Sequence, residues 1–208
     1  MAPPASPPAF QPPAVRDRLL AALSTAASSA VGPTSDFDTD WPIPADLGER
    51  PAGVLAAFHD DGRLLLTKRA SGLRHHPGQI ALPGGKVDPG DADVVAAALR
   101  EAREEVGLDP AQVEVLGVLS PHRTVTGFAM FPVLAMIRGP FTPIPEAGEV
   151  DEVFTVPFDH VADPARYRLE RRQWRGDWRS YHVAAYGPHY IWGATARVLL
   201  ALARRLRA

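Results

Sequence analysis

The chain contains a run of acidic residues whose spacing could bind a divalent cation. The run reads Arg100-Glu101-Ala102-Arg103-Glu104-Glu105-Val106-Gly107. In an α-helix, Glu104 and Glu105 lie one turn on from Glu101, so all three carboxylates project from one face. Like charges at this spacing repel one another, and a hard cation that binds carboxylate oxygens, waters and substrate phosphates would offset that repulsion. Arg100, one turn before Glu104, can hold that carboxylate in place.

A glycine-rich loop precedes the acidic run. It reads Leu82-Pro83-Gly84-Gly85-Lys86, and its two glycines allow the backbone to approach a ligand closely, because they lack side-chain bulk and tolerate unusual φ angles. An acidic cluster on a helix is by itself usually a solvated face. A glycine loop, a helix start and three carboxylates in that order are together the parts of a site that cleaves a pyrophosphate.

The elements that must position these residues follow from apolar periodicity. The spacing predicts a helix over Asp91 to Val106, with Asp91 as its cap and Gly107 as its end. A last helix is expected from Ile191 to Leu206. Strands are expected at Val54–Phe58, Leu64–Leu66, Val113–Leu119, Phe128–Ile137, Val150–Val156 and Tyr181–Tyr186. Asp61-Gly62 predicts a hairpin turn between the first two strands, and Pro132 predicts an edge or a bulge. This order favours one mixed α/β domain.

The N-terminal part differs in amino-acid composition from the rest of the chain. Residues Met1 to Pro13 are rich in proline and contain few bulky side chains, which predicts a disordered tail. A short helix is expected over Ala14 to Ala30 and an irregular connection over Val31 to Pro51. We therefore expect a tail plus helix over residues 1–30 and one domain with its connecting segment over residues 31–208.

Composition excludes several classes of protein. The 208 residues carry 22 Lys+Arg against 24 Asp+Glu and no cysteine. Near-neutral charge gives no general attraction to nucleic acid or to membranes, and the lack of cysteine excludes disulfide scaffolds, Cys-ligated metal sites and thiol catalysis. The sequence shows no secretory signal and no apolar run of membrane-spanning length. A cytoplasmic protein is expected.

Two motifs resemble those of a known family. Gly85, Asp91 and Arg100 to Leu108 resemble the Nudix box, G-x5-E-x7-R-E-U-x-E-E-x-G-U, where U is aliphatic; Asp91 replaces the first Glu, and eight residues separate it from Arg100. Leu66 to Gly85 resembles the signature of the coenzyme A pyrophosphatase branch, L-T-x-R-[SA]-x3-R-x3-G-x3-F-P-G-G, with Leu82 in place of Phe. The extra residue in the box is also typical of that branch.

The resemblance implies a fold and a reaction. The expected fold is a Nudix-type α/β/α sandwich with a mixed, curved sheet. The expected activity is hydrolysis, dependent on Mg2+ or Mn2+, of the diphosphate of coenzyme A or its derivatives to 3',5'-ADP and 4'-phosphopantetheine or its acyl form. Glu101 and Glu105 are the expected main metal ligands, with Glu104 a further one and the Gly85 carbonyl completing the set.

Other site residues are less sharply defined by the motifs. The general base is either a glutamate of the box or a later acidic residue, Glu149 or Glu152. The residues expected to contact substrate phosphates are Lys68, Arg69, Arg74, Gly84 and Gly85; adjacent His75 and His76 belong to the same basic cluster. The alternative for this cluster is a solvated hairpin edge.

The second basic run, Arg166 to Arg179, interleaves arginines with Trp174 and Trp178. A mobile loop over the substrate is favoured there over a nucleic-acid site, because acidic residues dilute the charge. The expected partner is a small-molecule substrate of a monomer or homodimer. Two alternatives stay open: a Nudix hydrolase of ADP-ribose or nucleoside triphosphates, and a Nudix-like sensor that binds a nucleotide without cleaving it.

Overall fold

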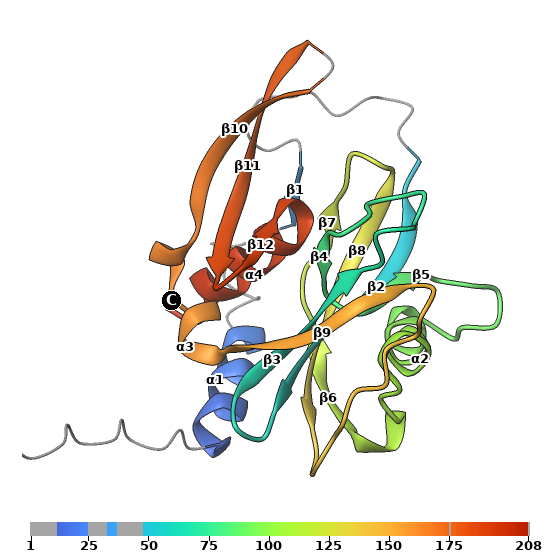
Figure 1. Ribbon diagram of the computed structural model, residues 1–208. Helices are drawn as coiled ribbons and strands as arrows, with labels where there is room; N and C mark the ends of the chain where they lie inside the picture. Colours follow the sequence, from blue (N-terminus) through green and yellow to red (C-terminus); the bar gives the residue numbers. More distant parts are fainter. Residues whose placement is uncertain (1–11, 25–32, 37–47, 175, 208) are drawn as a thin grey trace, which may run out of the picture.

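The protein folds around a large mixed β-sheet (Figure 1). The computed structural model describes residues 12–24, 33–36, 48–174 and 176–207. The strands of the main sheet are β1 (Thr34–Ser35), β2 (Arg50–His59), β3 (Arg63–Arg69), β4 (Ile80–Ala81), β5 (Gly84–Lys86), β6 (Val113–Val118), β7 (His122–Arg123), β8 (Phe128–Ile137) and β9 (Val150–Pro157). They run in the order β1-β7-β8-β2-β3-β4, with β5 on β2, β6 on β8 and β9 on β3.

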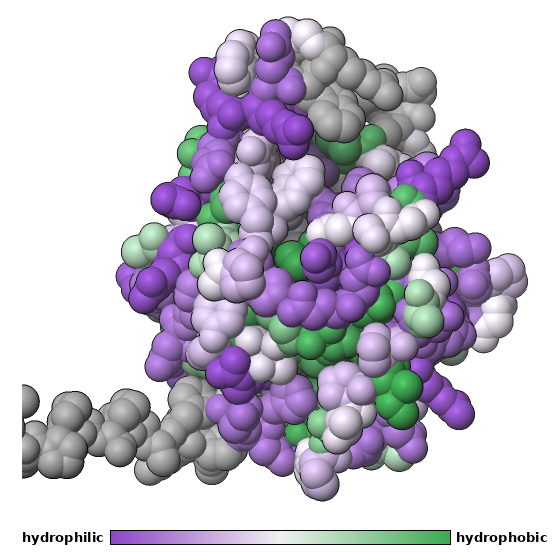
Figure 2. Space-filling model, viewed as in Figure 1, coloured by the Kyte–Doolittle hydropathy of each residue, from purple (hydrophilic) through white to green (hydrophobic). Residues whose placement is uncertain are grey.

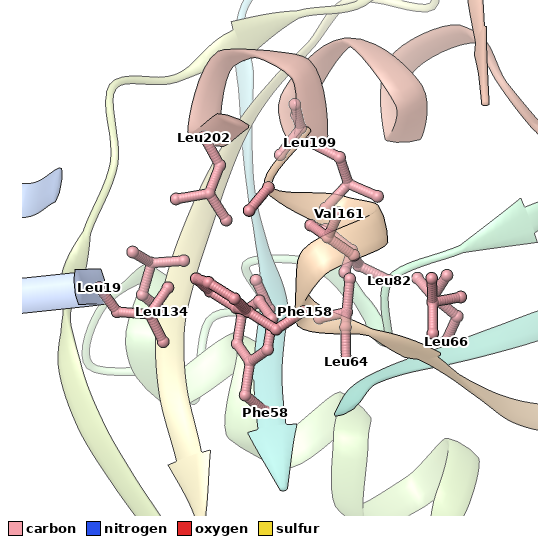
Figure 3. Close-up of a cluster of buried hydrophobic side chains, with 14 of the residues drawn as sticks. Leu19, Phe58, Leu64, Leu66, Leu82, Leu134, Phe158, Val161, Leu199 and Leu202 are labelled. Atoms are coloured by element: carbon pink, nitrogen blue, oxygen red, sulfur yellow. The ribbon is translucent and has the colours of Figure 1, made fainter. Parts of the chain in front are cut away.

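Helices cover both faces of this sheet. On one face, α2 (Val94–Val106) packs against a core that includes Leu55, Leu65 and Val133. The other face carries α1 (Pro12–Ser24), α3 (Phe158–Val161) and α4 (Gly193–Arg205). Figure 3 shows their core, in which Phe58 and Phe158 meet edge to face with ring centroids 5.7 Å apart. The expected α/β/α sandwich with a mixed sheet is confirmed.

The start of α2 differs from the prediction. Asp93, not Asp91, caps the helix, because its side chain accepts hydrogen bonds from the amides of Val95 and Ala96. Asp91 lies outside the helix and binds Arg100 instead. Gly107 ends the helix as expected, in the left-handed conformation at φ 71°, which glycine adopts without steric cost.

The N-terminal predictions were only partly correct. The helix begins at Pro12, inside the segment predicted to be disordered, and ends at Ser24; residues 1–11 and 25–32 lie outside the described residues. Val15, Leu19 and Ala22 are buried in the same core as α4, so α1 packs as part of the domain. Within the predicted irregular connection, Thr34–Ser35 forms β1, parallel to β7, and Arg50–Pro51 already belongs to β2.

The C-terminal segment contains strand where a loop was predicted. Residues Arg168–Trp174 (β10) and Asp177–Tyr186 (β11) form an antiparallel ribbon, which His189–Trp192 (β12) extends to three strands. The expected mobile loop is therefore wrong. The last helix also starts at Gly193 rather than Ile191, because Ile191 and Trp192 finish β12.

The other predicted strands are confirmed with small shifts of their ends, and the hairpin turn joins β2 to β3. Pro132 lies in a central strand, between the stretches of β8 that pair with β7 and β6. Two 3-10 turns, η2 (Pro110–Gln112) and η3 (Pro164–Arg166), complete the elements. None of the described helices has the length and apolarity needed to span a membrane.

Candidate active site

Glycines allow α2 to lie directly against the sheet. A Cβ at Gly53 would overlap the Val94 carbonyl of α2, and a Cβ at Gly85 would overlap the Glu101 carboxylate. Gly84 adopts φ 154°, a conformation that other residues rarely reach. The loop is thus glycine because backbone and carboxylate of the protein itself occupy the space of a side chain, whereas the sequence analysis gave close approach to a ligand as the reason.

Glu105 is buried rather than solvated. Only 4% of the residue is exposed, and its Oε2 accepts one backbone hydrogen bond, from the Gly84 amide at 3.3 Å. The pKa of Glu105 is raised to about 8, mainly by burial and secondly by the nearby charge of Glu101. The three carboxylates therefore do not share one exposed face: the side chain of Glu101 is 16% exposed and that of Glu104 57%.

Arg100 holds two of the carboxylates together. Its Nη1 donates to Glu101 Oε1 at 3.0 Å and to Glu104 Oε2 at 2.9 Å. Its other nitrogens donate to both oxygens of Asp91, at 3.0 Å each, and these bonds are the main reason that the pKa of Asp91 is lowered. Arg100 thus makes the expected contact that holds the Glu104 carboxylate in place. It also binds Glu101 and Asp91, which the sequence analysis did not predict.

The donor set around Gly85 fits a hard divalent cation completed by other ligands. Among the described residues, no three His, Cys, Asp or Glu side chains converge closely enough to form a metal site by themselves. However, the Glu101 carboxylate lies against the Gly85 backbone, and its pKa is raised by burial and by the charges of Glu104 and Glu149. This surplus of negative oxygen suits a cation such as Mg2+, which keeps waters and substrate phosphates among its ligands.

The later acidic candidates lie in different places. Glu149 lies within electrostatic range of the acidic cluster: burial is the main cause of the raised pKa values of Glu101 and Glu105, and the charge of Glu149 adds a smaller rise to both. The loop over residues 138–149 is fastened to the end of α2 by two backbone bonds, from the Ile144 amide to the Val106 carbonyl and from the Glu146 amide to the Glu105 carbonyl, both 2.9 Å.

Glu152 points away from α2. Side chains alternate along β9, with Val153 packed in the core under α2 and Phe154 packed in the core under α4. Glu152 shares the face of Phe154, and its Oε1 is 2.9 Å from His189 Nε2. The structure therefore brings Glu149, and not Glu152, to the acidic cluster.

The basic residues of the signature are also divided between two places. Arg69 follows a register shift between β3 and β9, where Asp151 of β9 is left without a partner on β3, and its charge partly offsets the rise in the pKa of Glu105 that burial causes. Lys68 lies opposite Glu152 in the register of β3 with β9. Its side chain is on the same sheet face as Leu66, the face away from α2. Arg74 and His75 are exposed in the loop between β3 and β4.

The segment around Asp36, which the sequence analysis did not assign to the site, lies within electrostatic range of His76 in this loop. His76 adopts φ 54°, the only positive φ of a non-glycine residue in the described part of the chain. His76 is exposed to solvent; partial desolvation of its ring and the charge of Arg69 lower its pKa, while the charge of Asp36 acts in the opposite direction. Asp36 is held by buried His122, 3.0 Å from its Nε2. No local motif marks either residue, because they are far apart in sequence.

A domain comparison matches residues 49–177 to the NUDIX domain. The chain is 41% identical over 162 residues to the Nudix hydrolase NudL of Enterobacter sp. (strain 638), covering 77% of this chain and 84% of that protein. It is 40% identical over 164 residues to NudL of Cronobacter sakazakii, covering 78% and 85%. A MutT NUDIX hydrolase structure from Burkholderia pseudomallei is 22% identical, covers 73% of this chain and 95% of that one, and has a TM-score of 0.46. The chain belongs to the Nudix family of hydrolases.

Proposed function

We propose that this Nudix hydrolase cleaves the diphosphate of coenzyme A or its derivatives, releasing 3',5'-ADP and 4'-phosphopantetheine or its acyl form. The observation that carries the proposal is the contact between the coenzyme A signature and the Nudix box. The amide of Gly84, which belongs to the signature, donates to Oε2 of Glu105 at 3.3 Å. The charge of Arg69, from the same signature, partly offsets the rise in the pKa of Glu105 that burial causes. Both observations support the proposal.

Arg69 also has capacity for a further contact. Its Nε is buried and has no hydrogen-bond partner in the part of the chain that the structure describes. A buried donor without a partner is costly, and a phosphate oxygen is the acceptor that a guanidinium suits best. Arg74, exposed in the adjoining loop, would meet a more distant phosphate. Lys68 is the weaker candidate, because it lies on the opposite sheet face.

Glu101 and Glu105, with the Gly85 carbonyl and Glu104, would hold the divalent cation that Nudix hydrolases generally use. When bound, the cation would neutralise phosphate charge and acidify the attacking water. Arg100 orients Glu101 and Glu104 through its bonds to both. The Gly84 amide fixes the carboxylate of Glu105, and burial of this carboxylate keeps bulk water away from it.

Glu149 is the proposed general base, because it is the later acidic side chain close to the cluster. Its carboxylate would accept the proton of the water whose oxygen attacks one phosphorus of the diphosphate. As the new P–O bond forms, the bond between that phosphorus and the bridging oxygen would break, and the other phosphate would leave with the bridging oxygen. Glu152 is instead engaged with His189, so we assign it no proton transfer.

The test is a substrate panel with purified protein and Mg2+: coenzyme A, ADP-ribose, NADH, dinucleoside polyphosphates and dGTP. Formation of 3',5'-ADP from coenzyme A, at a kcat/KM above that for the other compounds, is the expected result. Turnover only of ADP-ribose or nucleoside triphosphates would reject the substrate, while nucleotide binding without turnover of any compound would favour a sensor. The Glu105→Gln variant is the matched control for contaminating hydrolases.

A further inference from the structure

The β10–β11 ribbon ends in a strand edge that can pair with a second copy of itself. β10 is the outer strand of the three-stranded sheet, and among the described residues no other strand than β11 pairs with it. Figure 1 shows the ribbon rising beyond the main sheet, with β10 on its outer side, and the surface over its upper end is largely hydrophilic (Figure 2). An unpaired edge presents backbone donors and acceptors to any strand that can align with it.

Charged side chains on an edge strand usually prevent such pairing. Whether β10 can pair with a second copy of itself therefore depends on how its charged residues are placed. The strand has seven residues and its middle residue is Arg171. Two copies related by a two-fold axis overlap over the whole strand only if they run antiparallel with the two Arg171 residues opposite each other. This register places Glu170 of each copy opposite Arg172 of the partner subunit, giving two ion pairs of opposite charge. It also places the two Arg171 side chains opposite each other, so that two attractive pairs stand against one repulsive pair.

Nearby registers are unfavourable. An axis through Glu170 would oppose Glu170 to itself and Arg168 to Arg172, so that every charged pair would be repulsive. The strand therefore has one self-pairing register in which full overlap coincides with more attractive than repulsive charged pairs.

The side chains are already arranged for this register. Glu170 is held by the Tyr190 hydroxyl, which donates to its Oε2 at 2.7 Å, and it lies on the same ribbon face as Arg172. Arg171 lies on the other face, with its guanidinium 5.9 Å from the centre of the Trp178 ring. That face also carries exposed Leu169, and Leu169 and Trp178 are each 57% exposed. Exposed apolar side chains next to a free edge favour burial against a partner.

We propose that the protein forms a two-fold dimer through antiparallel β10–β10 pairing, with reciprocal Glu170–Arg172 ion pairs across the axis. The ribbons of the two subunits then form one continuous sheet. Each subunit keeps its own active site, which lies outside this shared sheet.

Charge exchange tests the ion pairs. Sedimentation equilibrium of the full chain should show a dimer. Glu170→Arg and Arg172→Glu should each weaken it at least about tenfold, since each puts like charges opposite each other, and the double exchange should restore it. Arg204→Glu, on exposed α4 surface, is the control and should leave the dimer unchanged. A monomeric wild-type protein at all concentrations, or a double exchange no better than the single ones, overturns the proposal.

Crosslinking tests the register without relying on charge. The chain has no cysteine, so one introduced thiol reports one position. Directly opposed Cα atoms in antiparallel strands are about 4.5–5.5 Å apart, within the span of a disulfide. Arg171→Cys should therefore give a covalent dimer under mild oxidation. Gln173→Cys should not, because the two copies of that position would be about 14 Å apart along the strands. Equal crosslinking at both positions overturns the register.

Discussion

Replacement of Glu105 by glutamine should stabilise the metal-free protein, and more so as the pH rises. The pKa of this carboxyl is about 8 in the folded protein against an ordinary 4.5, so the folded state keeps a proton that the unfolded chain has lost. The resulting cost to the fold is absent below about pH 4.5 and grows until about pH 8. At about 1.4 kcal/mol per pH unit it amounts to about 1 kcal/mol at pH 5 and about 3 kcal/mol at pH 7.

Glutamine has the same shape and can still accept the hydrogen bond of the Gly84 amide, but it does not ionise. We therefore expect Glu105→Gln to raise the free energy of unfolding by those amounts, or the melting temperature by about 6–12 °C at pH 7. The measurement is urea or thermal unfolding in EDTA at pH 5, 6, 7 and 8.

Glu104→Gln is the matched control, because it removes an exposed charge from the same helix and should change stability by less than about 1 kcal/mol. A gain for Glu105→Gln that is equal at pH 5 and pH 7 would refute the reasoning, as would a loss. With Mg2+ and substrate the same variant should lose nearly all turnover, since it removes a proposed metal ligand.

Three further substitutions separate the proposed roles. Gly85→Ala should keep the fold but lower kcat by about 100-fold, because the new Cβ displaces the Glu101 carboxylate; a normal rate would contradict this packing. Glu149→Gln should lower kcat by about 10²-fold or more, while Glu152→Gln should stay within about twofold of wild type; the reverse order would exchange their roles. Arg74→Ala should raise the KM for coenzyme A and leave kcat nearly unchanged, so a loss in kcat alone would remove this residue from substrate binding.

The sequence predicted the elements better than the contacts between them. Periodicity located α2 and the long strands within a few residues, because each is an amphipathic or apolar run. It placed the cap of α2 at Asp91 because nothing local shows that Arg100, nine residues later, takes that side chain and leaves the cap to Asp93. The run Arg166 to Arg179 predicts a loop because it lacks apolar alternation, and the strands found there, Arg168–Trp174 and the start of Asp177–Tyr186, form an exposed ribbon that gives little such signal.

The same limit applies to the site. The helical wheel assigned Glu105 to a polar face, although it lies three positions after Ala102 and seven after Ala98, both buried. That spacing places it at the edge of the apolar stripe and was the available signal for its burial. By contrast, no sequence pattern could choose between Glu149 and Glu152, since the choice depends on how one loop attaches to α2 and on which sheet face β9 turns toward it.

The attachment of the loop over residues 138–149 determines which amino-acid substitutions this loop can tolerate. Both bonds that fasten it to α2 come from backbone amides, at Ile144 and Glu146, and the Ile144 side chain is 72% exposed. Almost any side chain at position 144 therefore preserves the bond to Val106, and only proline, which has no amide hydrogen, would remove it. The Glu146 bond would remain, as would the bond from the Ala70 amide to the Glu149 carbonyl at 2.8 Å. The placement of this acidic residue is thus robust to sequence drift in the loop that carries it.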